Sequence, residues 1–558
     1  MLTPYEKGNQ NQTTLWTECI AFYEELARRF PNILKFEQAA VSDAGIPIHV
    51  GIVSADGVFD RDQIKREGRT VFFNNNGIHP GEPEGIDACM AMVRDLCFQP
   101  ERLAKLGRTV LLFVPVYNVD GCLNRANTSR PNQEGPEQFG FRGNSRHLDL
   151  NRDFIKCDTL NARFFNKLIT AWDPDVMVDT HTSNGADYTY TMTLIHTQPD
   201  KLGSGLGPYL REKMLPQIYQ DMEAAGWPTC PYVNPVKDTP DDGIADFLEV
   251  PRFSTGFTAL HNIIGFMPET HMLKPFRDRY DSMRALVEVT LAYTVANGEE
   301  IKRLRAAAKA AQRKQKDWAI TWTMDEARPA KFHFKGYEAQ RRPSVLGDYL
   351  RLSYDRSKPW ARDINWYTHF NADTVIQAPK AYVVPQAWRE VIERLQWNGV
   401  EMTRIEAPTT VQAQYYHVAE AQPRAHAYEG HMYHDVVALE KREGSFHLNV
   451  GDWYISLNQD NARYAIETLE PQAHDSFFRW GFFNSVLEKK EAISDYVFED
   501  LAVEMLEAEP ELKARFEAWK AANPALLSDQ DAVLHFIFHN CKRHAEPEWR
   551  RYPVLSIV

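Results

Sequence analysis

A histidine and, three residues later, a glutamate lie between an apolar run and a helical pattern. The stretch NNNGIHPGEPEG (74–85) follows TVFF and precedes IDACMAMVRDL, so His79 and Glu82 lie where a strand ends and a helix begins. Both side chains can then reach one point above the carboxyl edge of an α/β sheet, where such sheets place their sites. An imidazole and a carboxylate are two of the three protein ligands of a catalytic zinc ion. Alone the pair is a weak signal, because a helix N-terminus also favours a glutamate through its dipole.

Two later strand ends carry polar side chains that are costly to bury without a partner. The stretch DVMVDTHTSNG places His181 at the end of an apolar strand, and NIIGFMPETHM does the same for Glu269. Together with His79 and Glu82 they predict a His/Glu/His zinc site, with Glu269 free to act as a general base.

A third segment is a candidate for substrate binding. In FRGNSRHLDLNRDF (141–154), Asn151 and Arg152 follow the alternating pattern LDL. The planar guanidinium of arginine binds a carboxylate through two parallel hydrogen bonds. This pair is therefore a candidate for holding an anionic end of a substrate.

The elements that must position these residues alternate between strand and helix through the first 300 residues, which indicates an α/β layer fold. The predicted strands cover 33–40, 47–54, 70–76, 109–118, 175–182, 188–195 and 262–270, and the predicted helices cover 13–29, 83–97, 159–172, 207–225 and 276–297. The basic, alanine-rich residues 301–317 are predicted to form a solvated connecting helix. Residues 319–455 indicate sheet with one helix near 386–398, and residues 474–558 indicate helix.

Composition narrows the classes of function. The net charge of −13 and pI near 5.8 argue against a nucleic-acid partner, which needs a basic face. We expect no membrane span, because no run approaches 18 apolar residues. Seven scattered cysteines without a CxxC pair suggest neither a disulfide framework nor a cysteine zinc site. The N-terminus lacks a signal-peptide pattern, so we expect a cytoplasmic protein as the chain is written, or a periplasmic or secreted one if it has been trimmed.

The ordered motifs HPGE, VYNVDG, DLNRDF, DTHT and PETH resemble the zinc carboxypeptidases of the carboxypeptidase A type. The early stretch SDAGIPIHVGIVSA also resembles a hairpin of that family. The resemblance covers residues 1–300 and implies a mixed-sheet α/β catalytic domain there. Residues 301–317 would connect it to a β-rich and then helical region, 318–558, whose role the sequence does not give.

The resemblance also implies a role for each motif residue. The zinc ligands are His79, Glu82 and His181, and the general base is Glu269. The substrate carboxylate is held by Asn151 and Arg152. Asp149 would orient a zinc histidine, and Arg142 would polarise the scissile carbonyl, with Arg146 as its competitor.

Two features near the base bear on substrate choice. The family often has a mobile tyrosine about twenty residues before the base, whereas residues 240–269 contain none and carry Phe247, Phe257 and His261 instead. The stretch 252–262, expected to face the released side chain, contains no acid, so it offers no support for a preference for basic residues.

We therefore predict a zinc-dependent hydrolase that cleaves a peptide bond next to a free C-terminal carboxylate. One alternative is a zinc deacylase or amidase acting on N-acyl amino acids or murein peptides, which would use the same site. Another is a catalytically silent peptide-binding protein, which the intact set of ligands and base argues against. His426, His431 and His434 lie in a strand-rich region and are predicted to be surface or structural residues. The sequence gives no oligomeric state.

Overall fold

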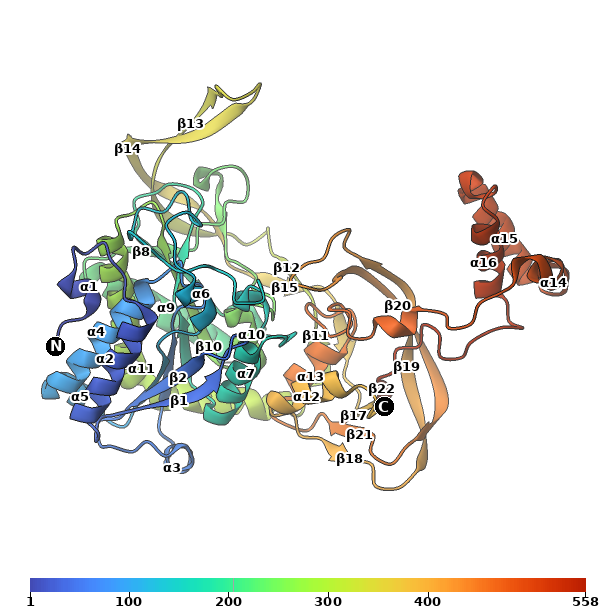
Figure 1. The fold of residues 1–558 in the computed structure, drawn as a ribbon, viewed down its shortest axis with the longest axis horizontal. Helices are drawn as coiled ribbons and strands as arrows, with labels where there is room; N and C mark the ends of the chain where they lie inside the picture. Colours follow the sequence, from blue (N-terminus) through green and yellow to red (C-terminus); the bar gives the residue numbers. More distant parts are fainter. Residues whose placement is uncertain (204) are drawn as a thin grey trace.

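The first half of the chain forms a nine-stranded mixed sheet with helices on both faces (Figure 1). The computed structural model describes residues 1–203 and 205–558. The strand order is β1-β2-β4-β3-β5-β10-β7-β8, and β6 pairs with β10. The strands are β1 (Leu34–Val41), β2 (Pro47–Val53), β3 (Val71–Asn75), β4 (Val110–Val114), β5 (Val176–Asp179), β6 (His181–Ser183), β7 (Met192–His196), β8 (Thr229–Pro231) and β10 (Ile264–His271).

The centre of this sheet is parallel and buried on both faces. Strands β4, β3, β5 and β10 are parallel neighbours, and all of their residues are buried. The sequences VFFNN, VLLFV and VMVD are near-continuous apolar runs, as expected of strands covered by helices on each side. Their carboxyl ends open at the same edge, which is where the polar residues of the motifs begin.

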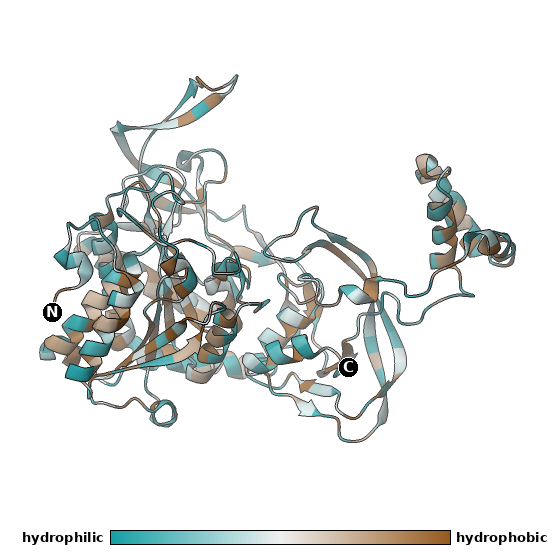
Figure 2. Cartoon of the chain, in the orientation of Figure 1, coloured by the Kyte–Doolittle hydropathy of each residue, from teal (hydrophilic) through white to brown (hydrophobic). Residues whose placement is uncertain are grey.

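Helices α2 (Trp16–Arg29), α4 (Glu84–Phe98) and α11 (Phe276–Gln312) cover one face, and α7 (Leu160–Trp172) and α10 (Ser254–Leu260) cover the other (Figure 1). Figure 2 shows hydrophobic residues on the sheet and on the inward sides of these helices. The remaining helices of this part are α1 (Pro4–Lys7), α3 (Arg61–Arg66), α5 (Pro100–Lys105), α6 (Val119–Leu123), α8 (Leu206–Tyr209) and α9 (Leu215–Ala224). The fold is thus the mixed α/β class that the sequence predicts.

The connecting segment differs from its prediction. The helix expected at 276–297 and the connecting helix expected at 301–317 are one helix, α11, which ends at Gln312. Its second half is not fully solvated, because Arg305 is buried and its guanidinium bonds Asp173 at 2.6 Å and Asp175 at 2.8 Å. Although this segment is rich in charged residues, one face of it is packed, since Ile301 and Ala308 are buried there.

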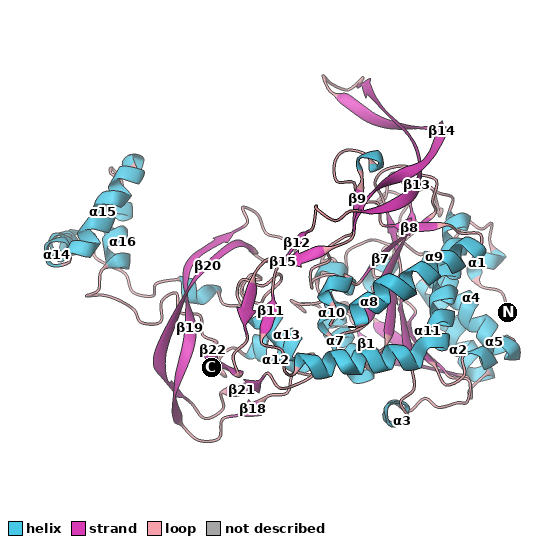
Figure 3. Cartoon of the chain, turned by 180° about the vertical axis from the view of Figure 1, so that it is seen from behind, coloured by secondary structure: helices cyan, strands magenta, loops and turns pink. Residues whose placement is uncertain are grey.

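Two sheets build most of the C-terminal region. The long hairpin β13 (Ala330–Pro343) and β14 (Leu350–Tyr367) projects from the body and pairs with β9 (Ile244–Ala245), as Figure 3 shows. The six-stranded sheet contains β17 (Ala381–Val384), β18 (Thr403–Arg404), β19 (Thr409–Pro423), β20 (His434–Leu448), β21 (Trp453–Ser456) and β22 (Leu555–Ile557). Helices α12 (Arg389–Trp397) and α13 (Ala462–Leu469) pack beside it, and the short pairs are β11 (Asp317–Ala319) with β16 (Val375–Gln377) and β12 (Trp322–Met324) with β15 (Phe370–Ala372).

The helices predicted in 474–558 form a small projecting module. They are α14 (Asp495–Ala508), α15 (Pro510–Ala522) and α16 (Gln530–Asn540), with a hydrophobic core of their own (Figures 1 and 3). The chain then returns as β22 to the six-stranded sheet, which the helical prediction missed. The main core runs from Tyr5 to Val554, so packing continues across the composition change near residue 318. Among the described residues, none of the helices combines the length and apolar character needed to cross a membrane.

The buried arginine of α11 yields a stability prediction. We expect Arg305→Ala to lower the free energy of unfolding by about 3–5 kcal/mol, because the buried Asp175 loses its guanidinium partner at 2.8 Å and keeps the ammonium of Lys302 at 3.4 Å. The matched control is Arg303→Ala on the exposed side of the same helix, which should change stability by less than about 0.5 kcal/mol. Urea unfolding followed by tryptophan fluorescence measures both. Equal effects of the two substitutions would show that the buried contacts of Arg305 do not hold α11 in place.

Candidate active site

A cavity of about 320 Å³ opens at the carboxyl edge of the central strands. Seven of the residues singled out from the sequence line it: His79, Glu82, Arg142, Asn151, Arg152, His181 and Glu269. They come from four separate segments of the chain. The fold therefore brings the predicted set together in one place.

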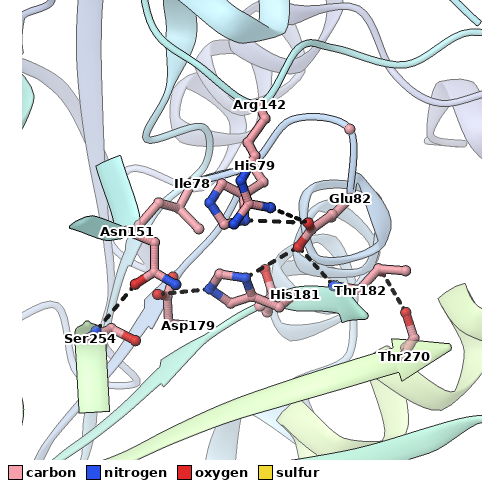
Figure 4. A network of polar contacts seen from close by, with 12 residues as sticks. Ile78, His79, Glu82, Arg142, Asn151, Asp179, His181, Thr182, Ser254 and Thr270 are labelled. Carbon is pink, nitrogen blue, oxygen red and sulfur yellow. Dashed lines mark hydrogen bonds and ion pairs between the residues drawn. The ribbon is translucent and has the colours of Figure 1, made fainter. Parts of the chain in front are cut away.

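Three of these side chains form a group able to hold a metal ion. Each of His79, Glu82 and His181 offers a ligand atom, and these atoms lie within 4.8 Å of one another. The Nδ1 atoms of the two histidines face the two oxygens of Glu82, at 3.3 Å and 3.2 Å (Figure 4). All three residues are buried, and Nδ1 of His79 has no hydrogen-bond partner among the described residues. Two imidazoles and one carboxylate with an unpaired buried nitrogen fit a divalent metal.

The local chain path explains why these three side chains converge. His79 and Glu82 lie in the turn between β3 and α4, where the N–H of Glu82 donates to the carbonyl oxygen of His79 at 2.8 Å. The N-terminus of α4 sits directly against the β5–β6 junction, since a side chain at Gly85 would clash with Thr180. The N–H of Thr182 then donates to Glu82 Oε2 at 2.8 Å.

A carboxylate stands behind each histidine. Nε2 of His79 lies 2.8 Å from Asp149 Oδ1, and Nε2 of His181 lies 3.1 Å from Asp179 Oδ2. Such partners fix the ring orientation and strengthen the imidazole as a ligand. The position of Asp149 is the one that the resemblance implies. Asp179 was missed, although a single acid inside the apolar strand VMVD was the signal that points to it.

The charges around Glu82 keep it ionised. Burial opposes this, but His79 and Arg130 hold the pKa of Glu82 well below its usual range. Arg130 donates to Glu82 Oε1 at 2.7 Å and to the carbonyl oxygen of Thr182 at 2.8 Å. Its side chain crosses over Gly81, where a Cβ atom would lie only 2.8 Å from Arg130 Cδ. No motif in the sequence marks Arg130, which comes from a loop.

The two arginines proposed for the scissile carbonyl have different places. Arg142 lines the cavity, where its Nε donates to Asp149 Oδ2 at 2.8 Å and one terminal nitrogen lies 3.4 Å from Glu82. Arg146 is exposed and donates to the carbonyl oxygen of Asp158. Of the two candidates, only Arg142 can meet a ligand in the cavity.

Glu269 faces the metal-ligand group from the next strand. In the parallel pairing of β6 with β10, Glu269 lies opposite His181. It is only 9% exposed, and its Oε2 has no hydrogen-bond partner among the described residues. Burial, together with repulsion from Glu82, raises the pKa of Glu269 to about 8. Its neighbour His271 has both ring nitrogens bonded to backbone atoms of Ala186 and Leu273.

Asn151 and Arg152 lie on the wall formed by the start of α10. The side-chain oxygen of Asn151 accepts from the N–H of Ser254 at 3.3 Å, and the guanidinium of Arg152 lies 4.4 Å from the ring centre of Phe253. Arg152 is therefore stacked on Phe253, and its Nη1 donates to the carbonyl oxygen of Asn151 at 2.8 Å, so the guanidinium is oriented and its remaining donors can serve an anion.

The rest of the wall contains aromatic residues and an unexpected acid. Tyr232 and Phe247 line the cavity with their rings edge to face at 5.8 Å, whereas Phe257 and His261 are buried outside it. Glu249 also lines the cavity, three residues before the acid-free stretch 252–262. Its Oε2 accepts from the N–H of Thr255 at 3.2 Å, and burial raises the pKa of Glu249 to about 6. The stretch 252–262 itself contains no acid, and Glu249 joins this wall from just before it.

Comparisons with known proteins agree with the geometry. The sequence profile of the family described as zinc carboxypeptidase matches residues 19–182. The chain is similar to carboxypeptidase 2 of Trichophyton equinum, with 23% identity over 73% of this chain and 72% of that protein. It is also similar to carboxypeptidase 2 of Trichophyton rubrum, with 22% identity over the same shares. A solved metallo-carboxypeptidase from Burkholderia cenocepacia aligns at a TM-score of 0.38 and 12% identity, over 52% of this chain and 70% of that one.

The carboxylate behind His181 supplies a test of the metal group. We expect Asp179→Asn to weaken binding of a divalent metal by about tenfold to a hundredfold, because the ring loses the partner that orients it. Metal titration of the metal-free protein against a chromophoric chelator measures the affinity. The matched control is Asp363→Asn, which breaks an exposed aspartate–histidine pair with His333 and should leave the affinity unchanged. Equal affinity in both variants would contradict the role of Asp179.

Proposed function

We propose that this chain, whose residues 19–182 match the zinc carboxypeptidase family, binds one zinc ion through His79, Glu82 and His181 and hydrolyses the bond next to a free C-terminal carboxylate. The observation that carries this proposal is a single cavity with three parts. It holds a three-residue ligand group, a carboxyl group beside it that is not part of that group, and an Asn–Arg pair for an anion. The relatives named carboxypeptidase favour this reading over the deacylase and silent-binding alternatives.

The ligand group suits zinc chemically. A bound zinc ion supplies Lewis acidity, which polarises a carbonyl and acidifies water. Asp179 raises the pKa of His181 well above its usual value, against the effect of burial, so the ring carries a proton when no metal is bound. Metal binding needs the neutral imidazole and must therefore release this proton.

The proton transfers are assigned to Glu269. As a carboxylate it accepts a proton from the attacking water and later delivers it to the leaving amine. Its burial without a partner at Oε2 leaves that oxygen free for this exchange. Arg142 and Arg130 lie in the same cavity, where their guanidinium groups stabilise the negative charge that develops on the carbonyl oxygen.

Asn151 and Arg152 determine which end of a peptide is cleaved. Arg152 binds the terminal carboxylate through its planar fork, and the stacking on Phe253 holds that fork in place. An internal segment of a peptide has no carboxylate to offer at this position. The pair therefore directs cleavage to the last residue.

The role of the base gives the most direct mutational test. We expect Glu269→Gln to lower kcat by about a hundredfold to ten-thousandfold, since it keeps the shape and removes the proton acceptor. Zinc content and thermal stability should stay unchanged, because Glu269 lies outside the ligand group. Steady-state kinetics and metal analysis measure these quantities.

His271→Ala serves as the comparison, since His271 is the nearby alternative base, and its effect on kcat should be small beside that of Glu269→Gln. Loss of zinc from Glu269→Gln would make Glu269 a ligand, and full activity would place the base elsewhere.

We further propose that Glu249 favours a released residue with a cationic side chain. The acid lines the cavity next to the wall of Phe253 and Thr255, on the side where the carboxylate of the last residue is held. A charged hydrogen bond from a lysine or arginine side chain to this buried carboxylate is stronger than one between neutral groups. Leucine or phenylalanine at the same position would leave the carboxylate of Glu249 without a cationic partner from the substrate.

Peptides that differ only in a C-terminal lysine or leucine test this preference. We expect Glu249→Gln to lower the ratio of their kcat/KM values by about tenfold to a hundredfold, as befits loss of a charged hydrogen bond. In the wild type the ratio should fall as the pH drops through about 6, because a carboxyl with this pKa is charged above that pH and neutral below it. The Gln variant should show no such change in the ratio. A wild-type preference for leucine at pH 8 would contradict the assignment.

A further inference from the structure

A tight turn in the C-terminal region has a strained backbone beside the substrate site. It lies between β19 and β20, where Tyr428 and His431 exchange backbone hydrogen bonds of 2.8 Å and 3.0 Å. Its two central residues both have positive φ, 48° for Glu429 and 81° for Gly430, as in a type I′ turn. Glycine adopts this conformation freely, but a glutamate does so at a cost, which points to a role for its side chain.

The side chain of Glu429 reaches across to the N-terminal part of the chain. Its Oε2 accepts a hydrogen bond from the backbone N–H of Asp149 at 2.9 Å. The side chain of Asp149 in turn bonds His79 and accepts from the N–H of Asn151 at 2.8 Å. Glu429 thus holds the first residue of the segment that carries Asn151 and Arg152.

The same turn fastens the other end of that segment. Nε2 of His431 lies 2.7 Å from Asp158 Oδ2, and its Nδ1 lies 2.8 Å from the carbonyl oxygen of Trp480. Asp158 also binds the buried ammonium of Lys156 at 2.9 Å. Residues 149–158 are therefore held at both ends by two residues of one turn. In the sequence, Glu429 of this turn lies 280 positions from Asp149. His431 has the structural role that the sequence indicates.

The segment at the start of α10, which forms the same wall as Asn151 and Arg152, is held by residues near this turn. The guanidinium of Arg252 lies 5.3 Å from the ring centre of Tyr428, 4.7 Å from that of Tyr433 and 5.0 Å from that of Trp480. It also pairs with the buried carboxylate of Asp475 at 2.7 Å. Arg252 directly precedes Phe253, on which Arg152 stacks.

We propose that the turn Tyr428–His431 is a positioning element of the substrate site and that Glu429 is a positioning residue for the Asn151–Arg152 pair. The inference rests on the proposed function, since it assigns Asn151 and Arg152 to the substrate carboxylate. On this proposal the C-terminal region contributes to catalysis, because it holds in place the segment that binds the C-terminal carboxylate of the peptide.

Three variants of the full-length, zinc-loaded enzyme test the proposal. Glu429→Gly removes the carboxylate and relieves the backbone strain, so it should fold at least as well as the wild type. We expect it to raise KM for peptides with a free C-terminus by about threefold to tenfold, the effect of losing one hydrogen bond. Its kcat should change by less than about twofold, because Glu269 and the ligand group do not move. Glu429→Gln keeps an acceptor oxygen and should restore most of the KM, and Glu420→Ala, an exposed glutamate of β19, is the matched control.

Amide hydrogen exchange supplies a second readout that needs no substrate. Peptides covering 147–153 should exchange faster in Glu429→Gly than in the wild type or in Glu429→Gln. Unchanged KM, or unchanged exchange, in Glu429→Gly would overturn the proposal, and so would a fall in melting temperature with loss of zinc. If the wild type cleaved no peptide with a free C-terminus, the proposed function would fail, and the exchange comparison would still decide whether Glu429 holds the segment.

Discussion

The site depends on one buried carboxylate, whose negative charge must be balanced by the groups around it. Glu82 is 2% exposed and lies between two imidazole rings, with a guanidinium at 2.7 Å. A buried charge of this kind is tolerated only when its partners are fixed in place. Asp149 and Asp179 therefore fix the two imidazole rings through their Nε2 atoms. The side chain of Arg130 can pass over residue 81 because that residue is a glycine without a side chain. Such a cluster, negative groups around two basic rings, is what a divalent cation would complete.

The sheet and the C-terminal region position different groups of the site. Parallel pairing places the carboxyl ends of β3, β5 and β10 at one edge, and the register of β6 with β10 sets Glu269 beside His181. These contacts position the groups proposed to do the chemistry. The groups proposed to hold substrate lie on two irregular segments, near residues 150 and 253, which have no strand partner to fix them. The carboxylate of Glu429 holds the first segment through the backbone N–H of Asp149. The aromatic rings around Arg252 hold the second segment in place.

Three of the residues predicted from the sequence share one property, a polar side chain at or just after the end of an apolar strand. His79, His181 and Glu269 are of this kind, and the strands before them are recognisable because both of their faces are buried. Arg130 and Glu249 lie in loops whose path depends on distant contacts, and Glu429 belongs to a turn far along the chain. No local pattern marks such residues.

The length of α11 shows the same limit of local patterns. Its basic half resembles a solvated helix, because the partners of Arg305 come from the turn after α7.

The most direct measurement follows one peptide and its C-terminally amidated copy through reaction with the zinc enzyme in water enriched in ¹⁸O. Mass spectrometry of the products should show loss of the single C-terminal residue from the free peptide. One ¹⁸O atom should appear in the new carboxylate of the shortened chain, and the amidated copy should stay intact. Cleavage of both peptides at the same internal bond, or release of an N-terminal acyl group instead of the last residue, would contradict the account.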